Sequence, residues 1–243
     1  MQKFYDYIEQ KPKYEDIKKS INNQEFPLLV NGVSLENIAF FADYNKYITH
    51  KKTVIILRDL HMARQVYQDL SKFNNKVLFL QTDELRLYFV EANDRQNEYT
   101  RITTLKKIYQ GDFDFLVVGV ASFLRKYMPK KYYKQNKIDI DMSSKIDTDE
   151  LSKKRVKLGY ERTPKVEAKA EFSIRGSIID IFSPDFANPV RIELFDDEVD
   201  SIRYFDIFSQ VSISKIEKIS VINCREYIYP DESERIDELS NLL

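Results

Sequence analysis

Short apolar runs alternate with amphipathic segments between Phe26 and Phe123. Apolar residues at helical spacing predict crossover helices around Leu35–Ala42, Ala63–Leu70 and Ile102–Ile108. The apolar runs predict strands, and they are Pro27–Val30, Thr53–Leu57, Lys76–Leu80 and Phe113–Val118. Continuous runs of leucine and β-branched residues are typical of parallel strands that are buried on both faces. This half of the chain is therefore predicted to be a wound α/β layer sandwich.

The pattern changes after Pro129, where strand-like runs follow one another closely. One helix is expected near Thr148–Leu158, and the acidic cluster Asp196–Glu198 between two runs is typical of a hairpin turn. The predicted strands are Ile138–Met142, Glu171–Ile174, Ile178–Phe182, Val190–Phe195 and Ser201–Phe205. Such spacing predicts an α+β domain with an antiparallel sheet. The segment Leu124–Lys137, with six bases and no acid, marks the crossing between the two parts.

Composition narrows the class of protein. The 243 residues carry 38 Lys and Arg against 39 Asp and Glu, so no overall field favours nucleic acid or a membrane surface. Cys224 is the only cysteine, which excludes an intrachain disulfide and a cysteine-based zinc site. The first residues lack the apolar core of a signal peptide, and no apolar run reaches the ~20 residues that span a bilayer. We therefore expect a cytoplasmic protein with no cofactor, no metal and no membrane contact.

The residues after the first predicted strand decide whether the chain holds a nucleotide. A phosphate-binding loop needs several glycines, a Lys for the phosphates and a Ser or Thr for Mg²⁺. The chain has five glycines in all, only Gly32 lies here, and the next lysine is Lys46, inside the following predicted helix. Ser34 is therefore interpreted as the N-cap of that helix. Neither histidine has a nucleophile near it in sequence, so no catalytic residue is predicted.

Charge is segregated in the second half of the chain. Residues 151–176 carry a balance of +5, and residues 177–206 carry a balance of −6. Alternation along the strands places four polar residues on one outer face, and they are Ser173, Arg175, Arg191 and Glu193. This face is either a partner-binding surface or a solvated sheet with weak ion pairs, each worth ~0–1 kcal/mol. The residues alone leave both interpretations open.

Three blocks in the second half resemble a known family. They are Leu158-Gly159-Tyr160-Glu161-Arg162, the run EFSIRGSIIDIF from Glu171, and the run PVRIELFDDEVDSIR from Pro189. In this order they resemble the module shared by the UvrB excision-repair proteins and the transcription-repair coupling factors, the Mfd family. The EVDSIR ending and the following Phe205-Asp206 look more like Mfd. A weaker likeness in the first half includes Arg95 and the pair Arg101-Ile102.

The resemblance implies a domain organisation. A degenerate RecA-like, P-loop-like α/β domain would occupy residues 1–127, with an α+β module of the UvrB domain 2 type inserted at residues 128–222. Residues 223–243 would begin the returning part of the first domain. The chain would then be the non-catalytic N-terminal piece of a longer, ATP-dependent DNA translocase, whose motor and RNA-polymerase-binding part lie beyond it.

The resemblance also explains the nucleotide loop. Active UvrB proteins carry Gly-Val-Thr-Gly-Ser-Gly-Lys-Thr where this chain has Gly32-Val33-Ser34-Leu35-Glu36-Asn37-Ile38-Ala39. Ile38 replaces the Lys that holds the phosphates, and Ala39 replaces the hydroxyl that binds Mg²⁺. Gly32, Ser34, Ile38 and Ala39 thus form a degenerate loop, and we expect no ATP hydrolysis by this chain.

In the family, the inserted module binds UvrA. The positions implicated there correspond to Arg162, Ser173, Arg175, Arg191 and Glu193. Four keep their charge type, whereas Ser173 stands where UvrB commonly has Arg and cannot offer a planar fork. The resemblance implies a charged patch that recruits UvrA to a stalled transcription complex and that is covered in the intact protein until activation.

Two other functions are weighed against this one. The basic segment Leu124–Lys137 interleaves tyrosines with bases, as DNA-binding surfaces do, and its candidate contacts are Arg125, Lys126, Lys130 and Lys131. The near-zero net charge and the lack of the tyrosine-rich hairpin that UvrB inserts into DNA predict weak, salt-sensitive binding at most. A surviving ATPase ranks third because of Ile38 and Ala39.

Overall fold

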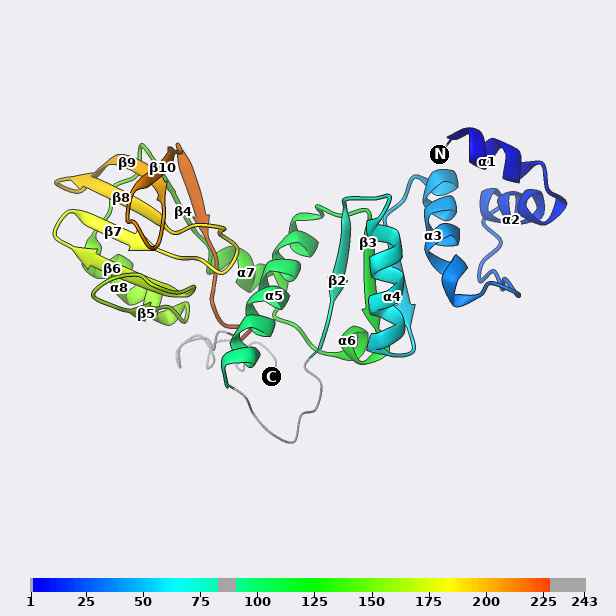
Figure 1. Cartoon of the computed structure of the whole chain (residues 1–243), viewed down its shortest axis with the longest axis horizontal. Helices are drawn as coiled ribbons and strands as arrows, with labels where there is room; N and C mark the ends of the chain where they lie inside the picture. Colours follow the sequence, from blue (N-terminus) through cyan, green and yellow to red (C-terminus); the bar gives the residue numbers. More distant parts are fainter. Residues whose placement is uncertain (1, 83–90, 228–243) are drawn as a thin grey trace, which may run out of the picture. The chain divides into compact units, whose positions relative to one another are not determined.

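The computed structural model describes residues 2–82 and 91–227, which are coloured in Figure 1. The chain divides into two compact units. The first unit comprises residues 1–82 and 110–125, and the second comprises residues 83–109 and 126–243. Within the described ranges, no helix has both the length and the apolar character that crossing a membrane requires.

A parallel sheet forms the centre of the first unit (Figure 1). Its three strands, in the order β1-β3-β2, are β1 (Thr53–Leu57), β3 (Phe115–Gly119) and β2 (Val77–Leu80). The helices of this unit are α1 (Gln2–Glu9), α2 (Pro12–Asn22), α3 (Leu35–Thr49), α4 (Leu60–Ser71) and α6 (Val120–Leu124). The predicted parallel sheet and its last three predicted strands are confirmed.

Helices α3 and α4 pack on one face of this sheet. Ala39 of α3 and Ala63 and Val66 of α4 lie in one buried cluster with Phe115 and Val117 of β3. Small and β-branched side chains at these positions let the helices approach the strands closely, as tightly packed interiors require. The predicted helical spacing in this half is thereby confirmed.

The predicted strand at Pro27–Val30 is wrong. Within the described residues these four positions belong to no sheet, and Leu29 is 82% exposed. Pro27 has no backbone N–H to donate to a sheet ladder, which disfavours a central strand here. The apolar run is therefore an exposed connection that leads into α3.

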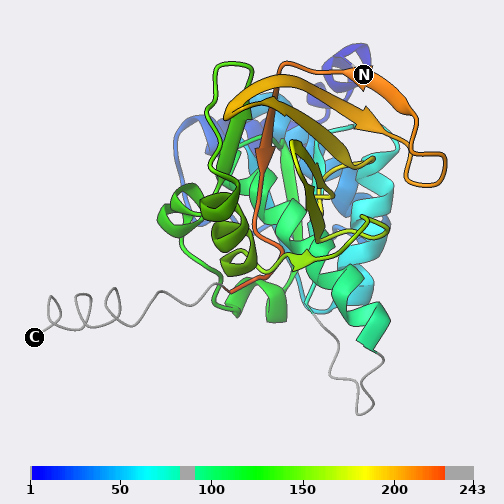
Figure 2. The same cartoon turned by 90° about the vertical axis from the view of Figure 1, so that its left-hand side faces the viewer.

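A six-stranded sheet dominates the second unit (Figures 1 and 2). Its order is β10-β9-β8-β7-β6-β5, and every neighbouring pair is antiparallel except β5 with β6. The strands are β5 (Glu161–Arg162), β6 (Glu171–Arg175), β7 (Ile178–Ile181), β8 (Val190–Phe195), β9 (Glu198–Phe205) and β10 (Ser212–Lys215). A smaller antiparallel sheet pairs β4 (Ile138–Asp141) with β11 (Lys218–Val221).

Three helices accompany these sheets: α5 (Glu91–Gln110), α7 (Lys130–Gln135) and α8 (Thr148–Lys157). The Asp147 carboxylate caps α8 by accepting from the backbone N–H groups of Asp149 and Glu150. A turn at Asp196 and Asp197 joins β8 to β9, as predicted, with Asp196 at a φ of 60°. The predicted antiparallel α+β organisation is confirmed.

One face of the six-stranded sheet forms the core of the second unit. Phe172, Ile179 and Ile192 point into it from three adjacent strands and are completely buried. The period-2 alternation thus directs apolar side chains inward and leaves the opposite face of the sheet polar.

A buried ion pair connects two other segments of this unit. Arg101 and Glu226 (Nε to Oε2, 3.1 Å) join α5 to the segment that follows β11.

Ile179→Ala is expected to lower the free energy of unfolding by about 2–5 kcal/mol, because it removes three buried carbons and leaves a cavity. Ile213→Ala is the matched control, since Ile213 lies exposed on edge strand β10, and it should change the unfolding free energy by less than ~0.5 kcal/mol. Urea denaturation followed by circular dichroism measures both. Equal losses would contradict the assignment of the core face.

Candidate functional site

Two rows of side chains cross strands β6 to β9 on the face of the sheet that points away from the core. In the register of the strands, the first row is Ser173, Asp180, Arg191 and Arg203, and the second row is Arg175, Ile178, Glu193 and Ser201. We call these two rows the polar face. Four of the five residues predicted to bind a partner therefore lie side by side, and Arg162 lies on β5 at the edge of the same sheet.

The Asp180 carboxylate is the centre of the polar face. Its side chain is only 1% exposed, yet it carries a charge in the middle of β7. Arg191 donates to it twice, from Nε to Oδ1 at 2.7 Å and from Nη2 to Oδ2 at 2.9 Å. Arg175 donates from Nη2 to Oδ2 at 2.7 Å. One buried acid therefore holds two arginines, which is the kind of pairing a buried charge requires.

The two arginines differ in how much they offer to a partner. Arg191 is 14% exposed, its guanidinium lies over the Phe205 ring at 4.5 Å, and it also donates to Gln210 at 3.0 Å. The hydrogen bond to Asp180 raises the pKa of Arg191 above its usual value. Arg175 is 47% exposed and shares one hydrogen bond with Asp180. Arg175 is therefore the more accessible cation, and Arg191 is the more rigid one.

Glu193 forms the second charged group of the polar face. Arg203 donates from Nη1 to Glu193 Oε2 at 2.7 Å and makes a further hydrogen bond to Oε1, while the Ser201 hydroxyl donates to Oε2 at 2.9 Å. The hydrogen bond from Arg203 is the main cause that lowers the pKa of Glu193. Glu193 thus stays ionised and its charge is matched by Arg203.

Ser173 lies on the predicted outer side of the sheet, but its side chain is covered and does not face solvent. It is 1% exposed, and its hydroxyl donates to the Pro164 carbonyl at 2.9 Å. The segment after β5 crosses this end of the face, anchored by the buried Val166. Ser173 therefore fastens a loop of its own domain, and in this structure its side chain is not open to a partner.

Two further residues of this sheet are exposed. Arg162 is exposed on β5, and its side chain makes no hydrogen bond or ion pair to the residues that the structure describes. The register pairs Arg162 with the core-facing Phe172, so Arg162 lies on the opposite side of the sheet from the polar face. Phe195 is 79% exposed at the end of β8 and follows the inward-facing Leu194, so it lies on the outer side of the sheet. Aromatic residues, including Phe, are enriched at protein–protein interfaces.

Sequence reasoning missed Asp180, Arg203 and Phe195. An acid inside the apolar run Ile178–Phe182 was a usable signal, because a charge in a strand needs a partner across the sheet. Arg203 stands in the block PVRIELFDDEVDSIR, but its pairing with Glu193 depends on the register between two strands. Only the structure shows that register.

The residues that were predicted to form a degenerate nucleotide loop lie in the first unit. Gly32 has a φ of 85°, and Ser34 occupies the N-cap position of α3 as predicted, although its hydroxyl accepts from Asn37 Nδ2 at 3.0 Å and not from a backbone N–H. Ile38 is half-buried against the core that contains Ala39. These two side chains pack against the sheet and carry no group that could bind phosphate or Mg²⁺.

In the basic segment Leu124–Lys137, several lysines are exposed, but one of the tyrosines is buried. Lys126, Lys130 and Lys131 of the second unit are exposed, whereas Arg125 of the first unit is partly buried. Tyr133 is buried with its ring 5.3 Å from the Tyr109 ring. A buried tyrosine cannot stack on a base, so the structure weakens the DNA-binding alternative. The exposed lysines could still contact DNA phosphates.

Part of the second unit is similar to a known protein family. Residues 138–227 match the family described as the UvrB interaction domain. The polar face lies entirely within the matched residues, and Gly32, Ser34, Ile38 and Ala39 lie outside them.

The whole chain is similar to transcription-repair coupling factors, which confirms the resemblance seen in the sequence. It is 33% identical over 230 residues to the transcription-repair-coupling factor of Bacillus subtilis (strain 168), covering 92% of this chain and 20% of that protein. The Staphylococcus epidermidis relative is 28% identical over 93% of this chain, and the Staphylococcus aureus (strain Mu50) relative is 31% identical over 84%. The chain spans about a fifth of the length of these relatives.

Asp180→Asn is expected to lower the free energy of unfolding by about 3 kcal/mol, because it leaves Arg191 partly buried without a counter-charge. Asp200→Asn is the matched control, because Asp200 lies exposed on β9. It should change the free energy of unfolding by less than ~0.5 kcal/mol. Denaturant titrations at neutral pH compare the two. A loss no larger for Asp180→Asn than for Asp200→Asn would show that the buried carboxylate does not organise the face.

The Glu193–Arg203 pair is expected to make stability depend on acid pH. Because the pKa of Glu193 is lowered in the folded state, the pair contributes fully above the unfolded-state value of ~4.3 and loses its contribution as the pH falls through the folded-state value. Arg203→Gln should raise the pKa of Glu193 in a carboxyl NMR titration and flatten the fall in stability below pH ~4. An unchanged Glu193 titration in Arg203→Gln would contradict this pairing.

Proposed function

We propose that the polar face of the UvrB interaction domain binds UvrA, and that the chain recruits UvrA to a stalled transcription complex as a non-catalytic module of a transcription-repair coupling factor. The observation that carries this proposal is the pair of arginines held by one buried carboxylate on the outer face of a sheet. A solvated face with loose, independent ion pairs needs no such buried centre.

Fixed arginines suit a binding surface for an energetic reason. A flexible arginine loses rotamer freedom when a partner immobilises it, at a cost of about 0.5–1.5 kcal/mol per side chain. Arg175 and Arg191 have lost much of that freedom already, because Asp180 holds both of them. Their planar groups keep unused donors that match a carboxylate on a partner. The surface is therefore prepared for association before the partner arrives.

The charge of the face indicates the chemistry of the matching surface. Asp180 neutralises one of its two arginines, and Arg203 balances Glu193. The remaining positive charge of the polar face favours an acidic patch on UvrA. Phe195 supplies an apolar contact beside it.

We further propose that residues 1–127 form a degenerate RecA-like domain and that residues 128–222 form the UvrA-interaction module inserted into it. The packing of Ile38 and Ala39 against the core of the first unit supports the loss of nucleotide chemistry there. Any translocase activity and any contact with RNA polymerase belong, in this proposal, to other parts of a longer protein. Residues 223–243 would start the return to the first domain, and positions 228–243 lie outside the described residues.

Arg175→Ala is expected to weaken binding of purified UvrA by at least about tenfold, because truncating an interface arginine typically costs ~2 kcal/mol. Arg175 is half-exposed and makes a single hydrogen bond, so the variant should fold. Titration calorimetry with UvrA measures the affinity, and circular dichroism checks the fold.

Two control variants separate the partner surface from general damage. Ser173→Ala should keep UvrA affinity within about twofold, because Ser173 is buried beneath the Pro164 segment. Lys153→Ala removes an exposed charge from α8, away from the polar face, and should also leave affinity unchanged. The proposal fails if the unaltered chain does not bind UvrA, or if Arg175→Ala binds as well as both controls.

A further inference from the structure

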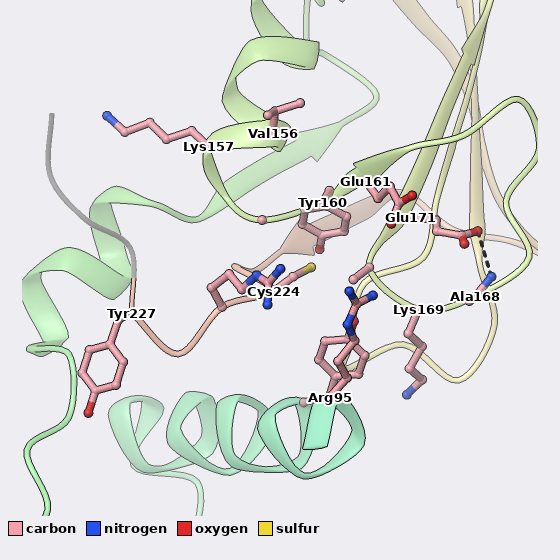
Figure 3. Close-up of a pocket in the computed structure, with 14 residues that line it drawn as sticks. Arg95, Val156, Lys157, Tyr160, Glu161, Ala168, Lys169, Glu171, Cys224 and Tyr227 are labelled. Atoms are coloured by element: carbon pink, nitrogen blue, oxygen red, sulfur yellow. Dashed lines mark hydrogen bonds between the residues drawn. The ribbon is translucent and has the colours of Figure 1, made fainter. Parts of the chain in front are cut away.

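A second candidate site is a cavity of about 720 Å³ in the second unit, shown in Figure 3. Helix α5, the connection from α8 to β5, the residues before β6 and the residues after β11 contribute to its walls. None of the residues of the polar face lines it. Its volume lies within the range of cavities that bind small molecules, about 300–1,000 Å³.

The cavity wall is more basic than acidic. Four cationic residues line it against two acids, and they are Arg95, Lys157, Lys169, Arg225, Glu161 and Glu171. The Glu171 carboxylate already accepts from the backbone N–H groups of Glu167 at 2.7 Å and Ala168 at 2.9 Å. The Lys169 amine donates to the Pro184 carbonyl at 2.7 Å. This leaves the two arginines as the cations with the most unused donors.

Arg95 is directed into the cavity. Figure 3 shows its side chain extending from α5 into the space bounded by Tyr160 and Glu171. Among residues 2–82 and 91–227, it makes no hydrogen bond or ion pair. Arg95 is exposed where it lines the cavity, and its five guanidinium donors can bind an anion there.

Arg225 reaches the cavity from the segment after β11. Its Nη1 lies 3.8 Å from Glu98 Oε2, a long contact that leaves most of its donors unused. The absence of a side chain at Gly159 leaves room for the Arg225 side chain, because a Cβ at Gly159 would lie 2.5 Å from Arg225 Cγ. The φ of +89° at Gly159 also disfavours any residue with a side chain. The turn between α8 and β5 is thus shaped to let Arg225 lie against it.

Tyrosine rings provide the apolar part of the wall. Tyr99 of α5 lies one helical turn after Arg95 and packs against the core, and Tyr227 is exposed at the other side of the lining. Rings beside arginines suit a ligand that joins an anionic group to a planar ring.

We propose that this cavity binds a phosphate-bearing small molecule of nucleotide size, with Arg95 and Arg225 holding its phosphates. Two guanidinium groups from separate elements can clamp one phosphate group through bidentate hydrogen bonds. The site is distinct from the degenerate loop of Gly32, Ser34, Ile38 and Ala39, which belongs to the other unit. The inference does not depend on the UvrA-binding role.

Titration calorimetry of the complete chain with ADP, inorganic pyrophosphate and adenosine tests the proposal. ADP and pyrophosphate should bind with a Kd below ~1 mM, and adenosine should bind more weakly because it lacks phosphate. Arg95→Gln and Arg225→Gln should each raise the Kd for ADP by about tenfold, since hydrogen bonds to charged groups are the strong ones. Gly159→Ala should weaken binding as well, because it displaces Arg225.

Lys153→Gln is the matched control, since Lys153 lies exposed on α8 and does not line the cavity. It should leave the Kd for ADP unchanged. A short single-stranded oligonucleotide distinguishes phosphate in nucleic acid from phosphate in a small molecule. No binding of ADP or pyrophosphate at millimolar concentration, equal binding by the arginine variants, or tighter binding of the oligonucleotide through the same arginines would each overturn the proposal.

Discussion

The Asp180 carboxylate sits in the middle of β7, almost completely shielded from water, and its charge has to be compensated within the sheet. Arg191 on β8 compensates it with two hydrogen bonds, and Arg175 on β6 adds a third. These contacts cross three strands, so the register of the strands determines which arginines are held. The polar face exists in this form because one buried acid fixes the side chains on either side of it.

The two faces of the six-stranded sheet have different roles, since one packs the core and the other carries the charged side chains. The inner face uses Phe172, Ile179 and Ile192 for packing, and hydrophobic burial there supplies stability. The outer face can then carry charge without weakening the core. In the first unit, Ile38 packs against the buried cluster that contains Ala39.

Much of the second unit was predictable from the sequence, since period-2 alternation in β6 to β9 identifies both strands and faces. Alternation placed Arg191 and Glu193 correctly on the outer side. It also placed Ser173 on the outer side, but it could not show that a loop from nine residues earlier in the chain covers this position. The prediction of a strand at Pro27–Val30 was wrong, because apolar character alone did not supply a neighbouring strand. A sequence pattern describes one strand at a time, and both differences concern what lies next to the strand.

Hydroxyl-radical footprinting of the chain with and without UvrA is the decisive test of whether the polar face binds UvrA, because it reports the solvent exposure of individual side chains. Phe195 is exposed at the end of the polar face, and Phe26 is exposed in the first unit. If the polar face binds UvrA, UvrA should protect Phe195 from oxidation and leave Phe26 unchanged. Protection of Phe26 with Phe195 still fully oxidised would contradict it.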